Sequence, residues 1–341
     1  MVELPPVKRF ESDSGVRIYR IPFQAFPHLD ARVYLLLGAG EPTLIDGGSG
    51  ALNSTSEILD GIRRVGEDFG EGVRPRDVRR MIITHAHIDH FGGASQVLAE
   101  MPEAIVYIHP LDAGPVAAWE EHAVLAKRRL AAFLSEAGVA PNEAAPLLDA
   151  SRYDRKRIAA VPVTALLTDG EVIDGMRVIH TPGHSPGHVC LAIGNILLSA
   201  DHVLAKTIPQ QWPESMLPFT GLAHYLESLD KIDQAGAFEL ALAAHEPVIH
   251  NLSARVATIR ASHLRRLDRL LDILRHAGRP LTIHEMTTRM YTEAVGFRGF
   301  LAVTDVGARV EYLHQRGRMR VENLDEIEHN PSAVPVYVPT D

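Results

Sequence analysis

The chain carries four side chains suited to metal binding within six positions, in the order His-x-His-x-Asp-His. They are His85, His87, Asp89 and His90, and they follow an apolar run at residues 81–83. An apolar run that leads into a polar cluster is typical of a buried strand that ends in a functional loop. Because side chains alternate across a regular strand, all four can face one ligand only from a loop that wraps around it. Imidazole nitrogen and carboxylate oxygen together suit zinc, with iron or manganese as alternatives.

Three further loops carry matching chemistry. His184 lies in a turn rich in Gly and Pro, and Asp201 and His245 each come at the end of an apolar run. Open sheets place their chemistry at the carboxyl ends of their strands. The sequence therefore predicts that these side chains converge with the first cluster on one rim of a sheet.

Composition bounds the size and partners of the protein. The 341 residues are 46% hydrophobic, enough for one large or two modest domains with a sizeable core. The net charge of −9 does not favour a generally anionic partner. The charge is uneven, since residues 253–321 hold 13 Arg, no Lys and 6 Asp or Glu. An acidic front part followed by an Arg-rich back part suggests two units with separate roles.

The elements that must position the site change character along the chain. Residues 1–252 alternate short strand patterns with helical patterns, which predicts a mixed sheet arrangement with helices outside. Residues 111–160 interrupt this rhythm, and we expect a helical insertion that acts as a lid. Residues 253–324 read as three helices and a short strand, the outline of a winged-helix domain. The acidic residues 325–341 are expected to form a loose tail.

Five motifs occur in an order that resembles one family. They are Leu-Ile-Asp-Gly-Gly at 44–48, the cluster at 85–93, Thr-Pro-Gly-His at 181–184, Ala-Asp-His at 200–202 and Ala-His at 244–245. With these motifs the chain resembles the metallo-β-lactamase-fold hydrolase superfamily over residues 16 to 250. More narrowly, it is similar to the glyoxalase II-like proteins with a C-terminal winged-helix unit. The resemblance implies an α/β fold built as a four-layer αββα sandwich.

The resemblance also implies a role for each side chain of the cluster. Seven side chains would hold two divalent metal ions, as two sets of three and one shared ligand: His85, His87 and His184; Asp89, His90 and His245; and Asp201. A hydroxide shared by the two ions would be the nucleophile, and Asp89 would be the catalytic residue that orients it and relays a proton. Asp46 would support the histidine loop from behind. Zinc is the first choice of metal, with iron or manganese as alternatives.

The chain departs from the family pattern at two positions that do not supply a ligand. Ala244 and Glu246 flank the last histidine where the family usually has glycine on both sides, and Arg32 stands where the family often has Asn. Neither change removes a ligand, and the family's substrate contacts are not carried over to this chain. His202 and Trp212 come shortly after Asp201 and are candidates for the substrate pocket.

The implied reaction is hydrolysis, for which two substrate classes remain. In the first interpretation the substrate is a thioester, lactone or related acyl compound enclosed by the helical insertion. In the alternative the protein is a metal-dependent endoribonuclease of the β-lactamase-like type, with residues 253–321 holding phosphates. The third helix of that unit offers only Arg309 and Arg316 for recognition, offset by Asp305 and Glu311. We therefore expect a small-molecule acyl substrate and place nucleic acid second.

Two observations concern location and assembly. The chain shows neither a stretch of membrane-spanning length nor a signal-peptide pattern at its N-terminus, so we expect a cytoplasmic protein with no membrane partner. The unit at residues 253–324 is also a candidate for packing against a second subunit, which would make the protein a homo-oligomer.

Overall fold

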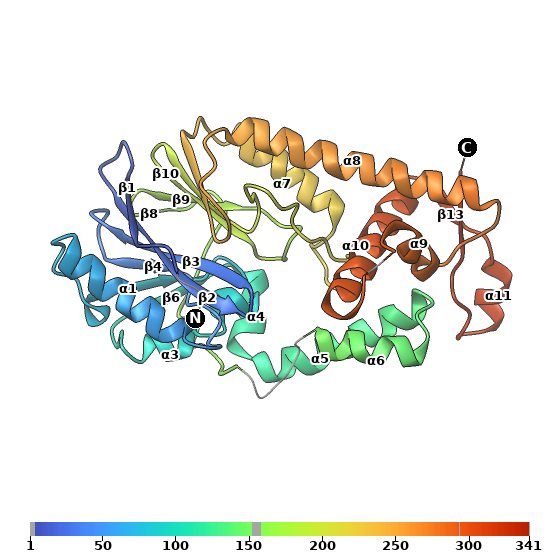
Figure 1. The fold of residues 1–341 in the computed structure, drawn as a ribbon, viewed down its shortest axis with the longest axis horizontal. Helices are drawn as coiled ribbons and strands as arrows, with labels where there is room; N and C mark the ends of the chain where they lie inside the picture. Colours follow the sequence, from blue (N-terminus) through green and yellow to red (C-terminus); the bar gives the residue numbers. More distant parts are fainter. Residues whose placement is uncertain (1–3, 152–157, 293, 341) are drawn as a thin grey trace.

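Two β-sheets packed face to face form the centre of the molecule, with helices on both outer sides (Figure 1). The computed structural model describes residues 4–151, 158–292 and 294–340. Side chains from both sheets meet between them, among them Ile18 and Leu36 from the first sheet and Leu191 and Leu198 from the second. The expected four-layer α/β sandwich is confirmed by this arrangement.

The first sheet has seven strands whose spatial order follows their order in the chain. Its strands are β1 (Lys8–Glu11), β2 (Arg17–Phe26), β3 (Leu29–Leu37), β4 (Thr43–Ile45), β5 (Arg80–Ile82), β6 (Ile105–Ile108) and β7 (Ala165–Leu166). Pairing is antiparallel from β1 to β4 and parallel from β4 to β7. The parallel half therefore points the carboxyl ends of β4 and β5 to the same edge.

The second sheet has five strands in the order β12-β11-β10-β9-β8. They are β8 (Val172–Ile173), β9 (Met176–His180), β10 (Val189–Ile193), β11 (Ile196–Ala200) and β12 (Leu240–Ala243). Every residue of β10 and β11 is buried, as expected for strands covered on both faces. β11 and β12 run parallel, so the residues that follow them leave the sheet at one edge.

Amphipathic helices cover the outer faces of the sandwich. On the first sheet, α1 (Ser54–Asp68) packs Ile58 and Ile62 against Phe23 of β2, and on the second, α7 (Leu222–Gln234) packs Leu229 against Leu197. Shorter elements complete the first half of the chain: the 3₁₀ helix at Pro75–Asp77, α2 (Ile88–Phe91) and α3 (Ala94–Leu98).

The helical insertion links two hydrophobic cores. It consists of α4 (Pro110–Ala117), α5 (Trp119–Glu136) and α6 (Pro141–Ala150); residues 152–157 of the expected segment lie outside the described residues. Trp119 and Ala123 at the start of α5 belong to the core beneath the first sheet. Leu130 and Phe133 near its end belong to the core that the C-terminal helices build. Its role as a lid stays a prediction.

The C-terminal part contains the three expected helices and a two-stranded sheet. These elements are α8 (Leu252–Ala277), α9 (Ile283–Met290), α10 (Gly296–Gln315), β13 (Met319–Val321), α11 (Leu324–His329) and β14 (Tyr337–Pro339). α8 runs along the top of the molecule in Figure 1, from beside α7 to the far end of the C-terminal part. The likeness of this unit to a winged helix stays a prediction.

Up to residue 340, where the description of the chain ends, the acidic tail contains most of α11 and all of β14, so the expectation of a loose segment at residues 325–341 was wrong for this part. β14 pairs antiparallel with β13, and the backbones of Leu281 and Tyr337 exchange two hydrogen bonds of 3.1 and 2.8 Å. The side chain of Asn323 also accepts a hydrogen bond from Val336 N. The expectation gave more weight to charge and proline content than to the Val-Tyr-Val alternation at 336–338, which suits a strand.

Candidate metal centre

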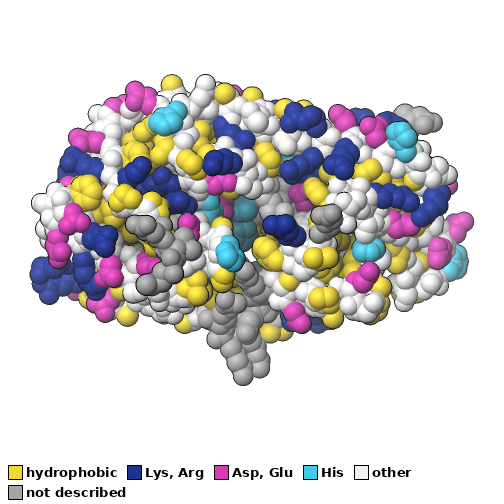
Figure 2. Space-filling view, viewed as in Figure 1, with side chains coloured by type: hydrophobic (Ala, Val, Ile, Leu, Met, Phe, Trp, Pro, Cys, Tyr) yellow, Lys and Arg dark blue, Asp and Glu magenta, His cyan; other side chains and the backbone are white. Residues whose placement is uncertain are grey.

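Four loops at one edge of the sandwich bring together the side chains predicted to act chemically. The first loop follows β5 and leads into α2, and the second joins β9 to β10. The third and fourth follow the parallel strands β11 and β12. Figure 2 shows histidine and acidic side chains together in a hollow near the middle of one face of the molecule.

The predicted ligand atoms converge around Asp201. Its Oδ2 atom lies 3.6 Å from His90 Nε2, 3.7 Å from His184 Nε2 and 3.6 Å from His245 Nε2. His245 Nε2 is also 3.3 Å from Asp89 Oδ2. The side chains form three overlapping groups, and within each group the ligand atoms lie within 4.8 Å of one another. The groups are His85, His87 and His184; His85, His90 and Asp201; and Asp89, His90 and His245. All seven side chains singled out in the sequence are therefore brought to one place.

Fixed acceptors orient three of the imidazole rings toward the centre. The ring Nδ1 atoms donate as follows: His90 to Asp46 Oδ2 at 2.7 Å, His184 to Gln210 O at 3.2 Å, and His245 to Asp30 O at 2.9 Å. A ring that donates through Nδ1 presents Nε2 with a free lone pair, which is the form that binds a metal. The rings of His85 and His87 contact each other directly, with His85 Nε2 3.0 Å from His87 Nδ1.

The donor set fits divalent cations on an observation independent of the family. His90 Nε2, His184 Nε2 and Asp201 Oδ1 are buried and have no hydrogen-bond partner among the described residues. A buried polar atom without a partner costs about 1–3 kcal/mol. Three such atoms at one point are explained when each donates its lone pair to a cation, and nitrogen with carboxylate oxygen is a donor set that zinc, iron and manganese accept.

Burial keeps one set of histidines neutral. Burial lowers the pKa of His87 to about 3, with the neighbouring His184 adding to the effect. Burial likewise lowers the pKa of His184, and it holds the pKa of His85 well below its ordinary value. Neutral imidazole is the metal-binding form, so these three rings are ready to bind at neutral pH.

Carboxylates raise the pKa of the other two rings. Burial alone would lower the pKa of His245, but Asp201 and Asp89 outweigh it and raise that pKa to about 9. Burial also opposes protonation of His90, yet Asp46 and Asp201 raise its pKa well above the ordinary value. Without metal these rings therefore carry protons that balance the acidic groups beside them.

Left-handed backbone occurs at three non-glycine residues of these loops. The φ angles are 67° at Asp46, 43° at Ala200 and 67° at Glu246. Such conformations cost about 1–3 kcal/mol and persist where their surroundings fix them. Asp46 is fixed by hydrogen bonds from Thr84 N at 2.7 Å and Thr84 Oγ1 at 3.0 Å, which ties it to the histidine loop as expected. Glu246 has the same left-handed backbone conformation, which glycine adopts most easily. The resemblance to the family predicts glycine at this position.

Two supporting residues escaped the sequence analysis. Asp112 in α4 is buried and accepts hydrogen bonds from Ala86 N at 2.8 Å, Ser185 Oγ at 2.8 Å and Gly187 N at 2.7 Å. It therefore joins the loop of His85 and His87 to the loop of His184. Like Asp46 and Asp201, it follows a strand within four residues, and this placement was the available signal.

His188 supports the shared ligand. Its Nε2 atom accepts a hydrogen bond from Asp201 N at 3.2 Å, and its Nδ1 atom lies 2.8 Å from Thr181 Oγ1. His188 therefore holds the backbone of Asp201 in place.

The two pocket candidates differ in their exposure. His202 is fully buried, with its ring 4.9 Å from that of Tyr225, so it lies inside the protein. Trp212 is partly buried and packs edge-on against Phe300 of α10, with ring centroids 5.3 Å apart. Their assignment to a substrate pocket stays a prediction.

Comparison with known proteins identifies the family. The model of the metallo-beta-lactamase superfamily matches residues 28–269. The chain belongs to this superfamily. The match covers both sheets from β3 onward and the first part of α8, and it confirms the expected hydrolase.

Two curated relatives of this metallo-beta-lactamase superfamily protein carry functional names. The acyl-coenzyme A thioesterase MBLAC2 of Homo sapiens is 28% identical over 224 residues, which cover 63% of this chain and 72% of that protein. The probable metallo-hydrolase YflN of Bacillus subtilis (strain 168) is 30% identical over 191 residues, covering 53% of this chain. That match spans 63% of YflN, less than two thirds of its length.

Two solved structures resemble the whole chain. A metallo-beta-lactamase family protein from Thermus thermophilus superposes with a TM-score of 0.73 at 25% identity, covering 95% of this chain and 98% of that one. A beta-lactamase domain protein from Burkholderia ambifaria gives a TM-score of 0.77 at 22% identity, with 98% and 94% covered. The fold they share therefore extends through the C-terminal helices.

Within the described ranges, every helix is too short or too polar to cross a lipid bilayer.

Proposed function

We propose that the protein is a dinuclear metal-dependent hydrolase of acyl thioesters, with acyl-CoA as the preferred substrate and lactones as related substrates. The observation that carries the metal-dependent part is the convergence of three buried, unpartnered ligand atoms from His90, His184 and Asp201. Hydrogen bonds from Nδ1 hold the rings of His90 and His184, and the backbone N–H of Asp201 donates to His188, so the loops that carry these atoms are held in place before a metal binds.

The seven side chains divide into two sets around Asp201. We assign His85, His87 and His184 to the first ion, Asp89, His90 and His245 to the second, and Asp201 to both. When bound, two divalent cations lower the pKa of a water molecule toward neutrality and polarise the oxygen of the bond under attack. Zinc is the first choice because its preferred donors are those present.

Asp89 is the residue that handles the proton. Burial opposes its ionisation, yet the hydrogen bond from His245 and the charge of His90 hold the pKa of Asp89 below its ordinary value, so the side chain is an ionised carboxylate at neutral pH. Asp89 is partly exposed and therefore reaches the open side of the centre. An ionised carboxylate there accepts a proton from the attacking water and orients it.

The chemistry of the leaving group favours a thioester. A thiol has an ordinary pKa of about 8.5, so a thiolate leaves without a strong acid beside it. A leaving group that needs no acid suits this site, because the histidines and carboxylates at the centre are all assigned as metal ligands or as residues that hold the ligands in place. The name of the thioesterase MBLAC2, 28% identical over 63% of this chain, supports the same class.

The arrangement of the C-terminal unit disfavours the ribonuclease alternative. A recognition helix needs exposed basic side chains, but Arg309 of α10 is 0% exposed and is ion-paired with Asp305. Other arginines of the unit bind the protein itself: Arg255 donates to Leu204 O, and Arg260 is ion-paired with Asp230. These three arginines therefore bond to other parts of the protein.

A substrate panel tests the proposal. Zinc-loaded protein is offered acyl-CoA thioesters, glutathione thioesters, lactones and single-stranded RNA. We expect thioester turnover that chelator treatment abolishes and zinc restores. Turnover of RNA alone would contradict the acyl assignment, and undiminished turnover in metal-free protein would contradict the metal assignment.

A further inference from the structure

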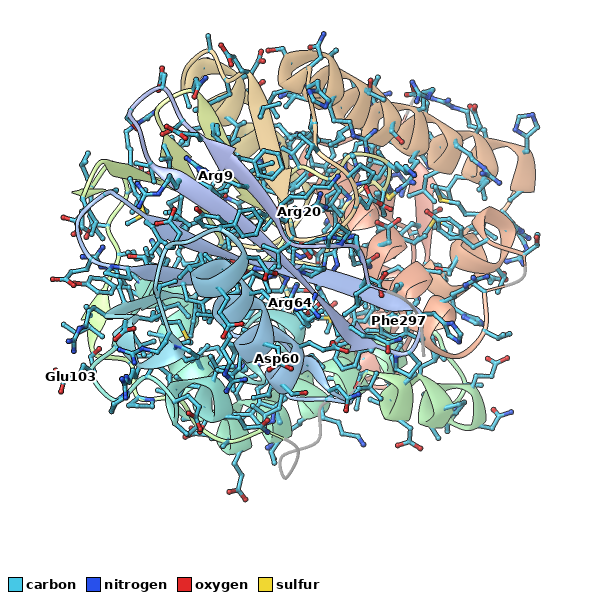
Figure 3. All side chains as sticks on the ribbon, turned by 60° about the vertical axis from the view of Figure 1, so that its left-hand side comes forward. Arg9, Arg20, Asp60, Arg64, Glu103 and Phe297 are labelled. Carbon is cyan, nitrogen blue, oxygen red and sulfur yellow. The ribbon has the colours of Figure 1, made fainter. Side chains whose placement is uncertain are left out.

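Three basic side chains lie together on neighbouring strands beside the metal centre. Lys8 of β1 is directly opposite Arg20 of β2, and Arg32 of β3 is opposite Pro22, on the diagonal from Arg20. They line a pocket of about 180 Å³ together with Pro5, Pro6, Pro22, Glu246 and Pro247. Figure 3 shows Arg20 on the ribbon of the first sheet, with Arg9 of β1 further toward its edge.

Like charges on facing strand positions destabilise a sheet, so this arrangement calls for a counter-charge. The Nε atoms of Arg20 and Arg32 are buried and have no hydrogen-bond partner among the described residues. Burial lowers the pKa of Arg32, and the neighbouring Arg20 adds to this. Two guanidinium groups therefore hold unused donors in a place where leaving them unpaired is costly.

The acidic groups nearby do not fill that role. Glu246 lines the pocket, but its carboxylate accepts hydrogen bonds from the backbone N atoms of Lys206 and Thr207 and from Thr207 Oγ1. Asp30 attracts Arg32, yet the hydrogen bond from Arg32 Nη1 goes to its backbone oxygen at 3.3 Å. Among the described residues neither carboxylate bonds to the two Nε atoms.

The pocket is built on the backbone that holds His245. Arg20 donates to the backbone oxygen of Glu246, the residue after His245, and His245 Nδ1 donates to the backbone oxygen of Asp30. The pocket is therefore connected through the backbone to two residues next to the candidate metal centre, Glu246 and Asp30.

We propose that Lys8, Arg20 and Arg32 form a phosphate subsite that binds the charged end of the substrate's thiol half. This proposal rests on the thioesterase function and adds to it the recognition of a phosphate-bearing thiol such as CoA. Arginine matches phosphate through paired hydrogen bonds, and the basic residues supply the opposite charge. A volume of about 180 Å³ admits a phosphate or diphosphate group but is small for a whole cofactor-sized ligand.

Kinetics with matched substrates test the subsite. The double variant Arg20→Gln/Arg32→Gln is compared with the wild type on an acyl-CoA and on the same acyl group carried by N-acetylcysteamine, which has no phosphate. We expect the KM for acyl-CoA to rise roughly tenfold or more, because a lost charge-assisted hydrogen bond has an effect of that size. The KM for the phosphate-free thioester should rise far less than the KM for acyl-CoA. The ratio of the two changes is the readout, because any indirect effect of Arg20 on the backbone of Glu246 acts on both substrates alike.

Two further variants protect the test from structural artefacts. Lys8→Gln changes an exposed side chain and should raise the KM for acyl-CoA by a smaller factor at unchanged kcat. Arg9→Gln is the matched control, since Arg9 is adjacent in β1, pairs with Tyr19 and lies on the opposite face. Bound zinc and the melting temperature are measured for every variant, so that a disturbed metal centre is recognised.

Direct binding separates failure of the subsite from failure of the thioesterase function. Calorimetry with adenosine 3′,5′-bisphosphate and with pyrophosphate should show binding to the wild type that the double variant loses. If wild-type protein cleaves acyl-CoA and the double variant keeps the same KM, the subsite is refuted and the function stands. If no thioester is cleaved but pyrophosphate binding depends on the arginines, the function is refuted and the anion subsite stands. An equal rise in KM for a glutathione thioester would refute the assignment to phosphate.

Discussion

The two sets of side chains at the candidate centre differ in how strongly carboxylates act on the pKa values of their rings. Behind His90 is the carboxylate of Asp46, and Asp89 and Asp201 lie beside His245. Behind His184 is only the backbone carbonyl of Gln210, and burial dominates the pKa of its whole set. Although both sets offer three donors, one is neutral and the other is charged in the metal-free protein.

The identity of the donor atoms therefore does not by itself determine how each half of a dinuclear site takes up its cation. The set of His85, His87 and His184 is ready to accept a cation without releasing a proton. The set of Asp89, His90 and His245 must exchange protons for its cation, because its rings are protonated at neutral pH. The two sets should therefore respond differently to mutation and to pH.

Removing the shared carboxylate should have the largest effect. Asp201→Ala takes away the carboxylate oxygen that lies within 3.7 Å of His90, His184 and His245 Nε2, so we expect both zinc ions to be lost. Metal catalysis contributes several kcal/mol and each 1.36 kcal/mol is tenfold in rate, so activity should fall about 1000-fold or more. Elemental analysis and thioester kinetics measure this, with circular dichroism as the control for folding. A variant that kept both ions would break the assignment of Asp201 to both sets.

Acidification should remove one ion before the other. His245 has a pKa of about 9 without metal, so protons compete with the second ion increasingly as the pH falls below that value. The pKa of His87 is about 3, so the first set stays neutral through the same range. We expect about two zinc ions per chain near pH 9 and about one near pH 6, because zinc needs neutral imidazole. Zinc content after equilibrium dialysis measures this, and simultaneous loss of both ions would contradict the contrast between the sets.

Weakening the support of His90 should affect the second set selectively. Asp46→Asn removes the negative charge behind the ring, and residues in this position typically change metal affinity by 10–100-fold. We expect a loss of affinity of this size for the second ion, while the affinity for the first ion stays the same. Zinc titration measures both affinities, and Asp60→Asn on the exposed face of α1 is the control. Equal weakening of both ions would mean that Asp46 stabilises the whole edge of the sheet.

The smallest effect should come from Asp112→Asn, which is the counterpart for the first set. Its carboxylate contacts the backbone and a hydroxyl of the ligand loops and no ring, so its loss shifts the loops slightly. We expect a severalfold weaker affinity for the first ion, which corresponds to about 1 kcal/mol, the lower end of the cost of disrupted buried hydrogen bonds. If the affinity for the second ion fell more than the affinity for the first, the assignment of Asp112 to the first set would be contradicted. Zinc titration alongside Asp46→Asn makes the comparison direct.

The sequence predicted the ligands better than the residues that hold them. Clustered His and Asp at strand ends are rare for any purpose other than chemistry, so the seven side chains stood out. Asp112 did not, because a single carboxylate in a helix has no local signature; its three donors come from residues 86, 185 and 187. Such a contact exists only once the chain has folded.

The fold was predictable where local pattern and burial agree. Strands such as β10 and β11 are continuous apolar runs, and the structure buries them completely. The tail at 325–341 failed because its order depends on pairing with Leu281 and β13, distant partners that no local pattern reveals. Likewise the charge of Arg309 suggested exposure, whereas Asp305 and His263 provide partners for it in the interior.

The core that α5 shares with the C-terminal helices has a consequence for engineering and evolution. Leu130 and Phe133 of the insertion pack in the same cluster as Leu270 of α8 and Val306 of α10. A truncation after residue 252 would strip the covering from these apolar side chains and leave a fragment prone to aggregate. We therefore expect that a cut after residue 252 does not yield two fragments that fold on their own, and that gain or loss of the last 89 residues requires compensating changes in the insertion.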